Sequence, residues 1–411
     1  MKKKILRSCL LSLTLLASCG NYGSSVRSEA SLEEFSVQSE AASEESSEVP
    51  SEKTVVTVVD ANGRSVEVMP GSYKKVVCIG AGALRMYSYV GDTALLAGVE
   101  DIDNTSLSNR PKMFDGVARP YLIAHEEDFQ KLPSCGVGGP KAQAAEPEKI
   151  LNCAPDIVVS EYEDVDKANA LQKQIGVPVI TLNFGTKGVF DDKTKASFEL
   201  LGKVFSKEER AEGILSYVDS CKAEISAKTK DIAEKPKAYI CGLGNWGTSD
   251  HLMTSNAYPC FSVSNIDNIV SDAGFANMGV QKLEKEKFEE LGPKMDVIII
   301  DSAAMKNIVP AYKEDPTLFD NVKAWKEGKV YLQLAYNAYY TNMELMLANT
   351  YFDAASVYPE TFKDFDMNAK LSEITSKFLG KDLTEKIDAY KYSYGGYQRI
   401  DTENFLTKYA A

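Results

Sequence analysis

The chain has 411 residues, of which 44% are hydrophobic, and its formal net charge is -13. This length is enough for two domains with sizeable cores. The acidic balance argues against a nucleic acid as partner, because binding to phosphates needs a basic surface.

Residues 1–18 have the pattern of an export signal. Lysines and an arginine precede a run of Leu and Ser at 8–16, which is a charged region followed by an apolar region too short to span a bilayer. The ending Leu16-Ala17-Ser18-Cys19 resembles the lipobox of bacterial lipoproteins. We therefore expect Cys19 to carry a lipid and to hold the protein at the outer face of the cell membrane; the alternative is an ordinary secretory signal with an incidental cysteine.

Residues 19–53 are rich in Ser and Glu and poor in large apolar side chains. Such a segment cannot bury enough surface to offset the entropy lost on ordering. We interpret it as a disordered tether.

Residues 54–205 predict a first α/β lobe. "TVVTVVDANGRSVEV" at 54–68 carries Asn62-Gly63 at its centre and predicts a β-hairpin. Four short apolar runs follow, separated by helical stretches: "KVVCIG", "ALLAGVE", "DIVVSE" and "PVITLNF". Strands of Val and Ile that alternate with helices favour a mainly parallel sheet covered on both faces.

Residues 206–232 predict one long helix, because apolar residues recur there at helical spacing. Ser206 followed by Glu209 is typical of a capping box. A helix of this length would extend about 40 Å and could connect two lobes.

Residues 233–411 predict a second α/β lobe with a mainly helical tail. Its apolar runs are "KAYICGLG", "MDVIIIDSA" and "KVYLQL", and it repeats features of the first lobe. In each half, one strand opens onto a Gly-rich turn, and a helix and a proline precede an Asp-headed strand. No further apolar run is long enough to span a membrane.

The cysteines favour no metal cluster. Of the eight, Cys9 belongs to the signal and Cys19 to the lipid site, and no CxxC pair occurs among the other six. Cys78 and Cys241 lie in apolar runs where a buried free thiol is the simpler interpretation. Disulfides stay undecided.

The order of these segments resembles the substrate-binding lipoproteins of bacterial ABC importers, in particular those that take up iron-siderophore complexes, haem and cobalamin. The lipobox, the tether, the hairpin, residues 74–101 and 146–160, the long helix and "KVYLQLAYNAYYTNMELMLANTYFDAASVYPE" carry this resemblance. It implies two Rossmann-like lobes joined by a single rigid helix, with little hinge motion and with ligand held between the lobes. It further implies no enzymatic activity, no cofactor, and an ABC permease as partner of what we expect to be a monomer.

Candidate ligand residues lie where predicted strands end, because ligands of open α/β sheets bind outside the carboxyl ends of the strands. Flat aromatic rings in such loops suit a large, partly apolar chelate, and Arg85 suits an anionic one, although Arg85 could instead pair with a nearby carboxylate. The ligand set that we predict is Arg85, Tyr87, His125, Tyr162, Trp246, His251, Tyr336, Asn337, Tyr339 and Tyr340.

The two histidines of the chain, His125 and His251, fall in predicted ligand loops of opposite lobes. Either could coordinate a metal centre of the chelate or bond a ligand carboxylate, although a surface histidine is the commoner case. Importers of bare zinc or manganese need several His and carboxylate ligands together, which two histidines supply poorly.

The family docks on its permease through one acidic residue on each lobe. The matching positions are Glu148 in "EPEKIL" and Glu289 in "KFEEL". A gapless alignment of the two halves instead places Phe288 at the second position, and Glu286 or Glu290 could also serve.

A ferric siderophore is the ligand that we expect, with haem or a corrinoid as alternatives. An enzyme of chelatase or reductase type on a related two-lobed scaffold is the competing hypothesis. Against it stands the absence of a GxSxG elbow, an HExxH motif or a paired-carboxylate motif from the sequence. The glycine turn "IGAGALR" at 79–85 lacks the third glycine of a dinucleotide fingerprint.

Overall fold

A computed structural model describes residues 54–140, 142, 144–162, 164–244 and 248–410. These residues belong to one compact unit that begins at Glu52. The positions of Cys19 and Trp246 lie outside the described residues, so the structure leaves the lipid site and this ligand candidate as predictions.

The first half of this unit contains the predicted hairpin and a parallel sheet. The hairpin pairs β1 (Val56–Val59) with β2 (Ser65–Val68) in antiparallel register around the Asn62-Gly63 turn, as predicted. The parallel sheet has the order β5-β4-β3-β6-β7. Its strands are β3 (Val76–Ile79), β4 (Leu96–Glu100), β5 (Ser134–Gly136), β6 (Ile157–Ser160) and β7 (Val179–Thr181).

Helices cover both faces of this sheet. Alternate strand residues point to opposite sides, and apolar residues on both sides are buried. Val76 and Cys78 of β3 pack on the side of α1 and α5, whereas Val77 and Ile79 pack on the side of α3 and α4. The helices of this half are α1 (Ala83–Val90), α2 (Pro120–Phe129), α3 (Pro147–Asn152), α4 (Val165–Ile175) and α5 (Asp192–Phe205).

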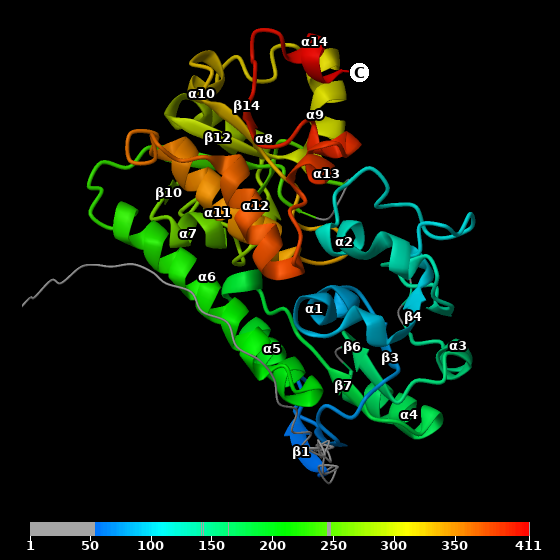
Figure 1. Cartoon of the computed structure of the whole chain (residues 1–411). Coiled ribbons are helices and arrows are strands. Elements are labelled where there is room, and N and C mark those ends of the chain that lie inside the picture. The colour runs from blue at the N-terminus through cyan, green and yellow to red at the C-terminus, as the bar shows by residue number, and fades with distance from the viewer. Residues whose placement is uncertain (1–53, 141, 143, 163, 245–247, 411) are drawn as a thin grey trace, which may run out of the picture. The chain divides into compact units, whose positions relative to one another are not determined.

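The long connecting helix is α6 (Glu208–Thr229), which runs from the end of α5 toward the second half of the unit (Figure 1). The predicted capping box is wrong. Ser206 adopts a left-handed conformation that ends α5, and no side chain caps the start of α6. Gly202 lets α5 and α6 pack closely, since a Cβ there would lie 3.0 Å from the Cβ of Ala211.

The second half contains a sheet of the order β10-β8-β12-β13-β14. All neighbouring pairs are parallel except β13 and β14, which are antiparallel. The strands are β8 (Lys237–Cys241), β10 (Asp267–Asn268), β12 (Val297–Asp301), β13 (Val330–Gln333) and β14 (Gln398–Arg399). A separate antiparallel pair joins β9 (Met253–Ser255) to β11 (Val280–Lys282).

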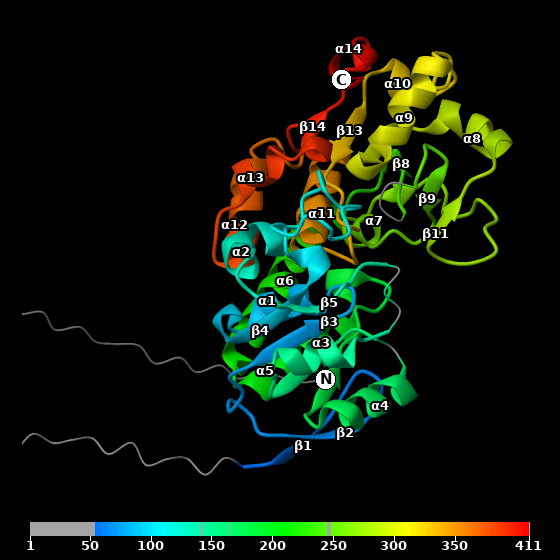
Figure 2. The ribbon, with the colours of Figure 1, turned by 90° about the vertical axis from the view of Figure 1, so that its right-hand side faces the viewer.

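Helices again cover both faces of the second sheet. Ile240 and Ile299 share one core with the first half, whereas Tyr239 and Ile300 belong to a separate core. Figure 2 shows α12 and α13 beside α2, and these helices are in contact. The helices are α7 (Pro259–Val263), α8 (Lys285–Leu291), α9 (Ser302–Glu314), α10 (Lys323–Lys326), α11 (Met343–Val357), α12 (Met367–Leu379), α13 (Thr384–Asp388) and α14 (Phe405–Tyr409).

The structure thus has two mainly parallel α/β sheets connected by α6, which confirms the predicted fold class. The exact lobe boundaries, 54–205, 206–232 and 233–411, stay a prediction. All six cysteines of the described part are buried and free.

Candidate functional site

The carboxyl ends of strands from both sheets meet in one small apolar cluster. Ile102 and Phe114 follow β4 of the first sheet, and Ala303 and Ala335 follow β12 and β13 of the second. Ligands of open α/β sheets bind at such carboxyl edges. This meeting region is therefore the candidate functional site.

A tight loop of residues 334–342, here called the tyrosine loop, connects β13 to α11 across this region. Asn337 and Thr341 form an isolated antiparallel bridge, and the Asn342 N–H donates to the Tyr336 carbonyl at 2.7 Å. Tyr339 and Tyr340 have φ angles of 55° and 64°. Left-handed backbone is rare outside glycine and costs about 1–3 kcal/mol per residue, so neighbouring contacts must hold the loop in this shape.

Tyr339 projects from the tyrosine loop into the first half of the unit and is only 5% exposed. Its hydroxyl donates to Glu100 Oε2 at 2.7 Å and accepts the N–H of Gly139 at 2.9 Å. Its ring packs against Phe114, with the centroids 5.7 Å apart. Burial raises the pKa of the Tyr339 phenol, and the charge of Glu100 raises it further, so the phenol stays neutral.

Glu100 ends β4 and is buried beneath Tyr339. The Gly80 N–H donates to its Oε1 at 3.1 Å. Burial raises the pKa of Glu100 to about 7, although the hydrogen bonds from Tyr339 and Gly80 oppose the rise. Both protonation states of this carboxyl are therefore populated near neutral pH.

Arg85, in α1, binds the tyrosine loop through hydrogen bonds. Its guanidinium donates to the carbonyls of Ala338 and Tyr339, each at 2.8 Å, and lies 4.7 Å from the ring centroid of Tyr121. Burial raises the pKa of Glu344 in α11, and the positive charge of Arg85 opposes that rise. Arg85 is completely buried, so it joins the two halves of the unit and is no cation at the mouth of a cleft.

A hollow of about 630 Å³ opens beside Gly139, next to the Tyr339 contact. Exposed Lys112 supplies a positive charge there, and Met113 and Val137 expose much of their apolar surface. The remaining lining residues include Pro111, Gly138, Pro140 and Glu146.

The other aromatic and amide candidates of the tyrosine loop lie near the same edge. The ring of Tyr340 is 48% exposed and stacks on Phe184, with a centroid distance of 5.4 Å and an interplanar angle of 12°. Asn337 Nδ2 donates to the Gly244 carbonyl at 3.2 Å, and Tyr336 stacks on Tyr258. The structure therefore places Tyr336, Asn337, Tyr339 and Tyr340 near the candidate site, and their role in ligand binding stays a prediction.

Tyr162 also lies at a carboxyl edge, just beyond β6. Its hydroxyl donates to the Ala142 carbonyl at 3.3 Å, and its ring lines a pocket of about 180 Å³ with Ser160. Burial raises the pKa of this phenol. Tyr162 therefore stays a ligand candidate.

Tyr87 and His125 are not in the candidate site, which corrects their predicted positions. Tyr87 is buried, packs edge-on against Phe205 and donates to the Asp92 carbonyl. His125 lies in α2, where its Nδ1 is 3.4 Å from Thr93 Oγ1, just before the amino end of β4. Both contacts place these side chains near the amino edge of the sheet, because their helices run back from the carboxyl edge.

His251 is likewise displaced from the site. Its ring packs edge-on against Phe288 and Phe319 in the separate core of the second half. Burial lowers the pKa of His251 and lowers that of His125 to about 4. Both imidazoles are therefore neutral at physiological pH, and neither faces the hollow beside Gly139.

The two proposed docking carboxylates are exposed on short helices. Glu148 lies in the first turn of α3. Glu289 lies on α8, with its Oε1 3.9 Å from the Lys285 Nζ. Phe288 is only 3% exposed, so the position given by the gapless alignment is part of the core.

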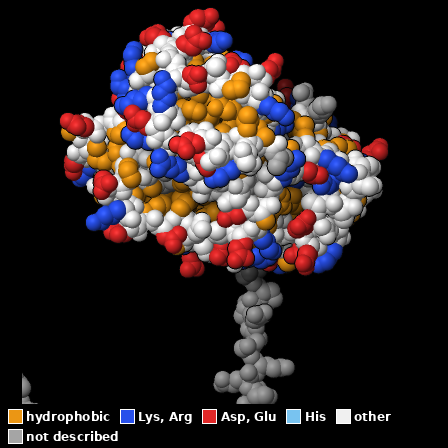
Figure 3. All heavy atoms as spheres, turned by 90° about the horizontal axis from the view of Figure 1, so that it is seen from above, with side chains coloured by type: hydrophobic (Ala, Val, Ile, Leu, Met, Phe, Trp, Pro, Cys, Tyr) orange, Lys and Arg blue, Asp and Glu red, His pale blue; other side chains and the backbone are white. Residues whose placement is uncertain are grey.

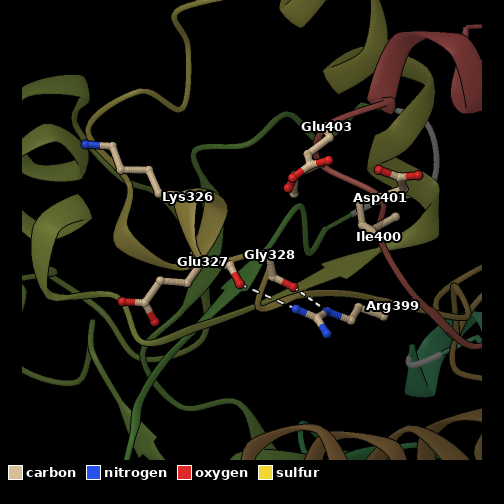
Figure 4. Close-up of a pocket in the computed structure, with 8 residues that line it drawn as sticks. Lys326, Glu327, Gly328, Arg399, Ile400, Asp401 and Glu403 are labelled. Atoms are coloured by element: carbon tan, nitrogen blue, oxygen red, sulfur yellow. Dashed lines mark hydrogen bonds between the residues drawn. The ribbon is translucent and has the colours of Figure 1, made fainter.

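A third pocket, of about 370 Å³, lies in the second half (Figure 4). Gly328 precedes β13, so this pocket is at the amino edge of the sheet, opposite the tyrosine loop. Arg399 donates to the carbonyls of Gly328 and Glu327, and Asp401 pairs with Lys408 at 2.8 Å. The charges of Arg399 and Asp401 are therefore satisfied within the chain.

The sequence analysis missed several residues that form the site, namely Glu100, Phe114, Gly139 and Phe184. The sequence contains a signal for Glu100, because an acidic residue at the end of an apolar strand indicates a polar group at the carboxyl edge of the sheet. The roles of Phe114, Gly139 and Phe184 depend on their contacts with Tyr339 and Tyr340, which are about 150 to 230 residues away in the sequence and leave no local pattern.

No group of three or more His, Cys, Asp or Glu side chains in the described residues could hold a metal ion. None of the helices that the structure describes is both long and apolar enough to cross a membrane.

The surface that lies at the top in Figure 1 carries charges of both signs between apolar side chains (Figure 3).

Comparison with known proteins identifies related folds. A family model described as periplasmic binding protein matches residues 76–333. A periplasmic solute-binding protein from Veillonella parvula is 19% identical, with 82% of this chain and 96% of that chain covered and a TM-score of 0.62. The molybdate periplasmic binding protein MolA of Haemophilus influenzae is 17% identical, with 80% and 98% covered and a TM-score of 0.59.

A third solved structure, the TroA-like periplasmic binding protein FepB from Veillonella parvula, is 20% identical, with 80% of this chain and 97% of that chain covered and a TM-score of 0.57. A search of curated proteins gives no match. At these identities the solved structures show a shared fold, and the matched family model covers the segment from β3 to β13.

Proposed function

The chain belongs to the periplasmic binding protein family, and from this membership we propose that it captures an iron chelate and delivers it to the permease of an ABC importer. The family consists of solute-binding proteins, which favours binding over catalysis. A ferric siderophore is the first candidate ligand, and haem or a corrinoid is the alternative.

One observation carries the choice of a large chelate. The hollow beside Gly139 has a volume of about 630 Å³ and combines apolar Met113 and Val137 with the cationic Lys112. Pockets of roughly 300–1,000 Å³ with mostly apolar linings are typical of small-molecule sites. An anionic chelate with an apolar periphery matches this lining better than a bare ion, for which the described residues offer no ligand group.

Tryptophan fluorescence tests capture. The chain has two tryptophans, and Trp325 is buried against Phe319, so a Trp325→Phe variant leaves Trp246 as the reporter. Titration of the chain from Thr54 onward with ferric siderophores, haemin and cobalamin should give saturable quenching by one chelate. The signal should persist in Trp325→Phe and vanish in Trp246→Phe.

A charge reversal locates the site in the same titration. Lys112→Glu should weaken binding of an anionic chelate about tenfold, which corresponds to about 1.4 kcal/mol. Lys131→Glu, a change at a lysine with a 71% exposed side chain, is the matched control and should leave affinity unchanged. Saturation by a bare metal salt or by molybdate, with no response to any chelate, would refute the proposed ligand class.

Delivery requires a position at the membrane and a contact with the permease. We propose that a lipid on Cys19 anchors the protein as a monomer at the outer face of the membrane, that residues 19–53 form the tether, and that Glu148 and Glu289 contact the permease. Both carboxylates are exposed, as such a contact requires.

Uptake of labelled chelate by whole cells tests the lipid anchor and the two docking carboxylates. Cys19→Ala and Glu148→Ala/Glu289→Ala should each reduce uptake severalfold while chelate affinity stays unchanged. Glu212→Ala, at an exposed position on α6, should have no effect. Normal uptake by the double variant would rule out these two residues as the docking pair.

A further inference from the structure

The tyrosine loop contacts the segments that follow both outer strands of the first sheet. The sheet order places β5 and β7 at opposite sides. Tyr339 bonds to Gly139, three residues beyond β5, and Tyr340 stacks on Phe184, three residues beyond β7. The loop therefore lies across the edge at which an α/β sheet of this kind binds its ligand.

The shape of this loop depends on contacts made by a few side chains. Two consecutive non-glycine residues, Tyr339 and Tyr340, adopt left-handed backbone, which is unfavourable in isolation. The hydroxyl of Tyr339 and the guanidinium of Arg85 supply polar contacts at the two strained residues and their neighbour Ala338. A competitor for these contacts would release a loop that is already strained.

The slot that holds the Tyr339 hydroxyl has a defined chemistry. The hydroxyl donates one hydrogen bond to a buried carboxylate oxygen of Glu100 and accepts one from the backbone of Gly139. A phenol or alcohol group of a ligand can make the same pair of bonds. The slot also adjoins the hollow lined by Gly138 and Gly139.

We propose that the tyrosine loop is a plug that the ligand displaces, and that Glu100 and Gly139 then bind a hydroxyl group of the ligand in place of Tyr339. This inference rests on the proposed function and narrows it to chelates that carry a hydroxyl group not bound to the metal. It also adds Glu100, which is absent from the ligand set predicted from the sequence, to the specificity-determining contacts.

Hydrogen exchange of the full chain tests the plug without any chelate. Tyr339→Phe keeps the ring and removes both hydrogen bonds, so amide exchange in peptides covering 137–140 and 334–342 should become at least about tenfold faster. Tyr331→Phe, which removes a hydroxyl from β13 where the ring packs against Phe352, is the control and should leave both peptides unchanged. Unchanged exchange in Tyr339→Phe would overturn the plug.

A cavity variant tests the chemistry of the slot. In Tyr339→Ala, millimolar phenol should slow exchange of the 137–140 peptide severalfold, toluene of similar shape should not, and an added Glu100→Ala change should abolish the effect of phenol. Equal protection by phenol and toluene would overturn the hydroxyl slot. If Tyr339→Ala does not fold, the Tyr339→Phe comparison still decides on the plug.

Chelate binding separates this inference from the proposed function. A hydroxyl-bearing chelate should associate severalfold faster with Tyr339→Phe than with the unmodified chain, because the plug then opens more often. Equal association rates would overturn the plug while leaving capture intact. If no chelate binds either protein, the proposed function fails, and the exchange measurements decide the plug and the slot by themselves.

Discussion

Replacing Arg85 with Ala is expected to lower the free energy of unfolding by about 3–5 kcal/mol, because two hydrogen bonds from a charged donor are lost and each contributes about 1.5–3 kcal/mol. The variant loses two hydrogen bonds to the backbone of the tyrosine loop and the contact with the Tyr121 ring. It also leaves the buried Glu344 without the nearby positive charge that opposes its rise in pKa. Urea unfolding followed by circular dichroism measures the loss.

A double variant shows how much of this loss is electrostatic. Arg85→Met/Glu344→Gln removes both charges, so the two changes together should cost less than the sum of the single changes. Lys131→Ala, at an exposed ion pair with Asp128, should change stability by no more than about 0.5 kcal/mol. A loss below about 1 kcal/mol for Arg85→Ala would show that Arg85 does not join the two halves of the unit as described.

Gly242→Ala should destabilise the protein by about 3 kcal/mol, through strain and crowding together. Gly242 follows β8 with a φ angle of +83°, and an added Cβ would lie 2.2 Å from the Cβ of Ala304 at the start of α9. Neither atom is the end of a flexible side chain, so the backbone must shift.

Gly63→Ala in the hairpin turn is the matched control for crowding. Gly63 has a similar φ angle of +75°, but nothing lies within 4 Å of a Cβ at that position. Gly63→Ala should therefore lower the free energy of unfolding only through backbone strain, by about 1 kcal/mol. Midpoints of urea unfolding compare the two variants, and equal losses would show that the contact with Ala304 relaxes freely.

The main strands could be predicted because their apolar side chains face cores on both sides. Runs such as Val76–Ile79 and Val297–Asp301 are completely buried in the structure, and their Val and Ile content indicates this from the sequence alone. The strands β5, β10 and β14 could not be predicted in the same way. They have only three, two and two residues, and pairing with a neighbour defines them.

Local patterns were less reliable at helix ends. The spacing of Ser206 and Glu209 matches a capping box, but Ser206 is needed in the left-handed conformation that ends α5. The turn between α5 and α6 requires that conformation because the two helices pack against each other at Gly202 and Ala211. Tertiary packing therefore overrides the capping pattern.

The site was predictable as a region but not as a set of side chains. The rule that ligands bind at the carboxyl ends of strands led to the tyrosine loop, because the alternation of strands and helices in the sequence predicts where the parallel strands end. It also selected Tyr87, His125 and His251. The side chains of Tyr87 and His125 contact residues near the amino edge of the sheet, and His251 packs in the separate core of the second half. Glu100 and Gly139 become important only through Tyr339, a contact across 239 and 200 residues.

The six buried thiols bear on where this protein can fold. Since all cysteines of the described part are free and inaccessible, no covalent cross-link holds this unit together. Burial raises the pKa of Cys78 and Cys135 well above the usual value, so the reactive thiolate is scarce and oxidation is slow. No disulfide is part of the fold of the described residues, so forming this fold requires no oxidant.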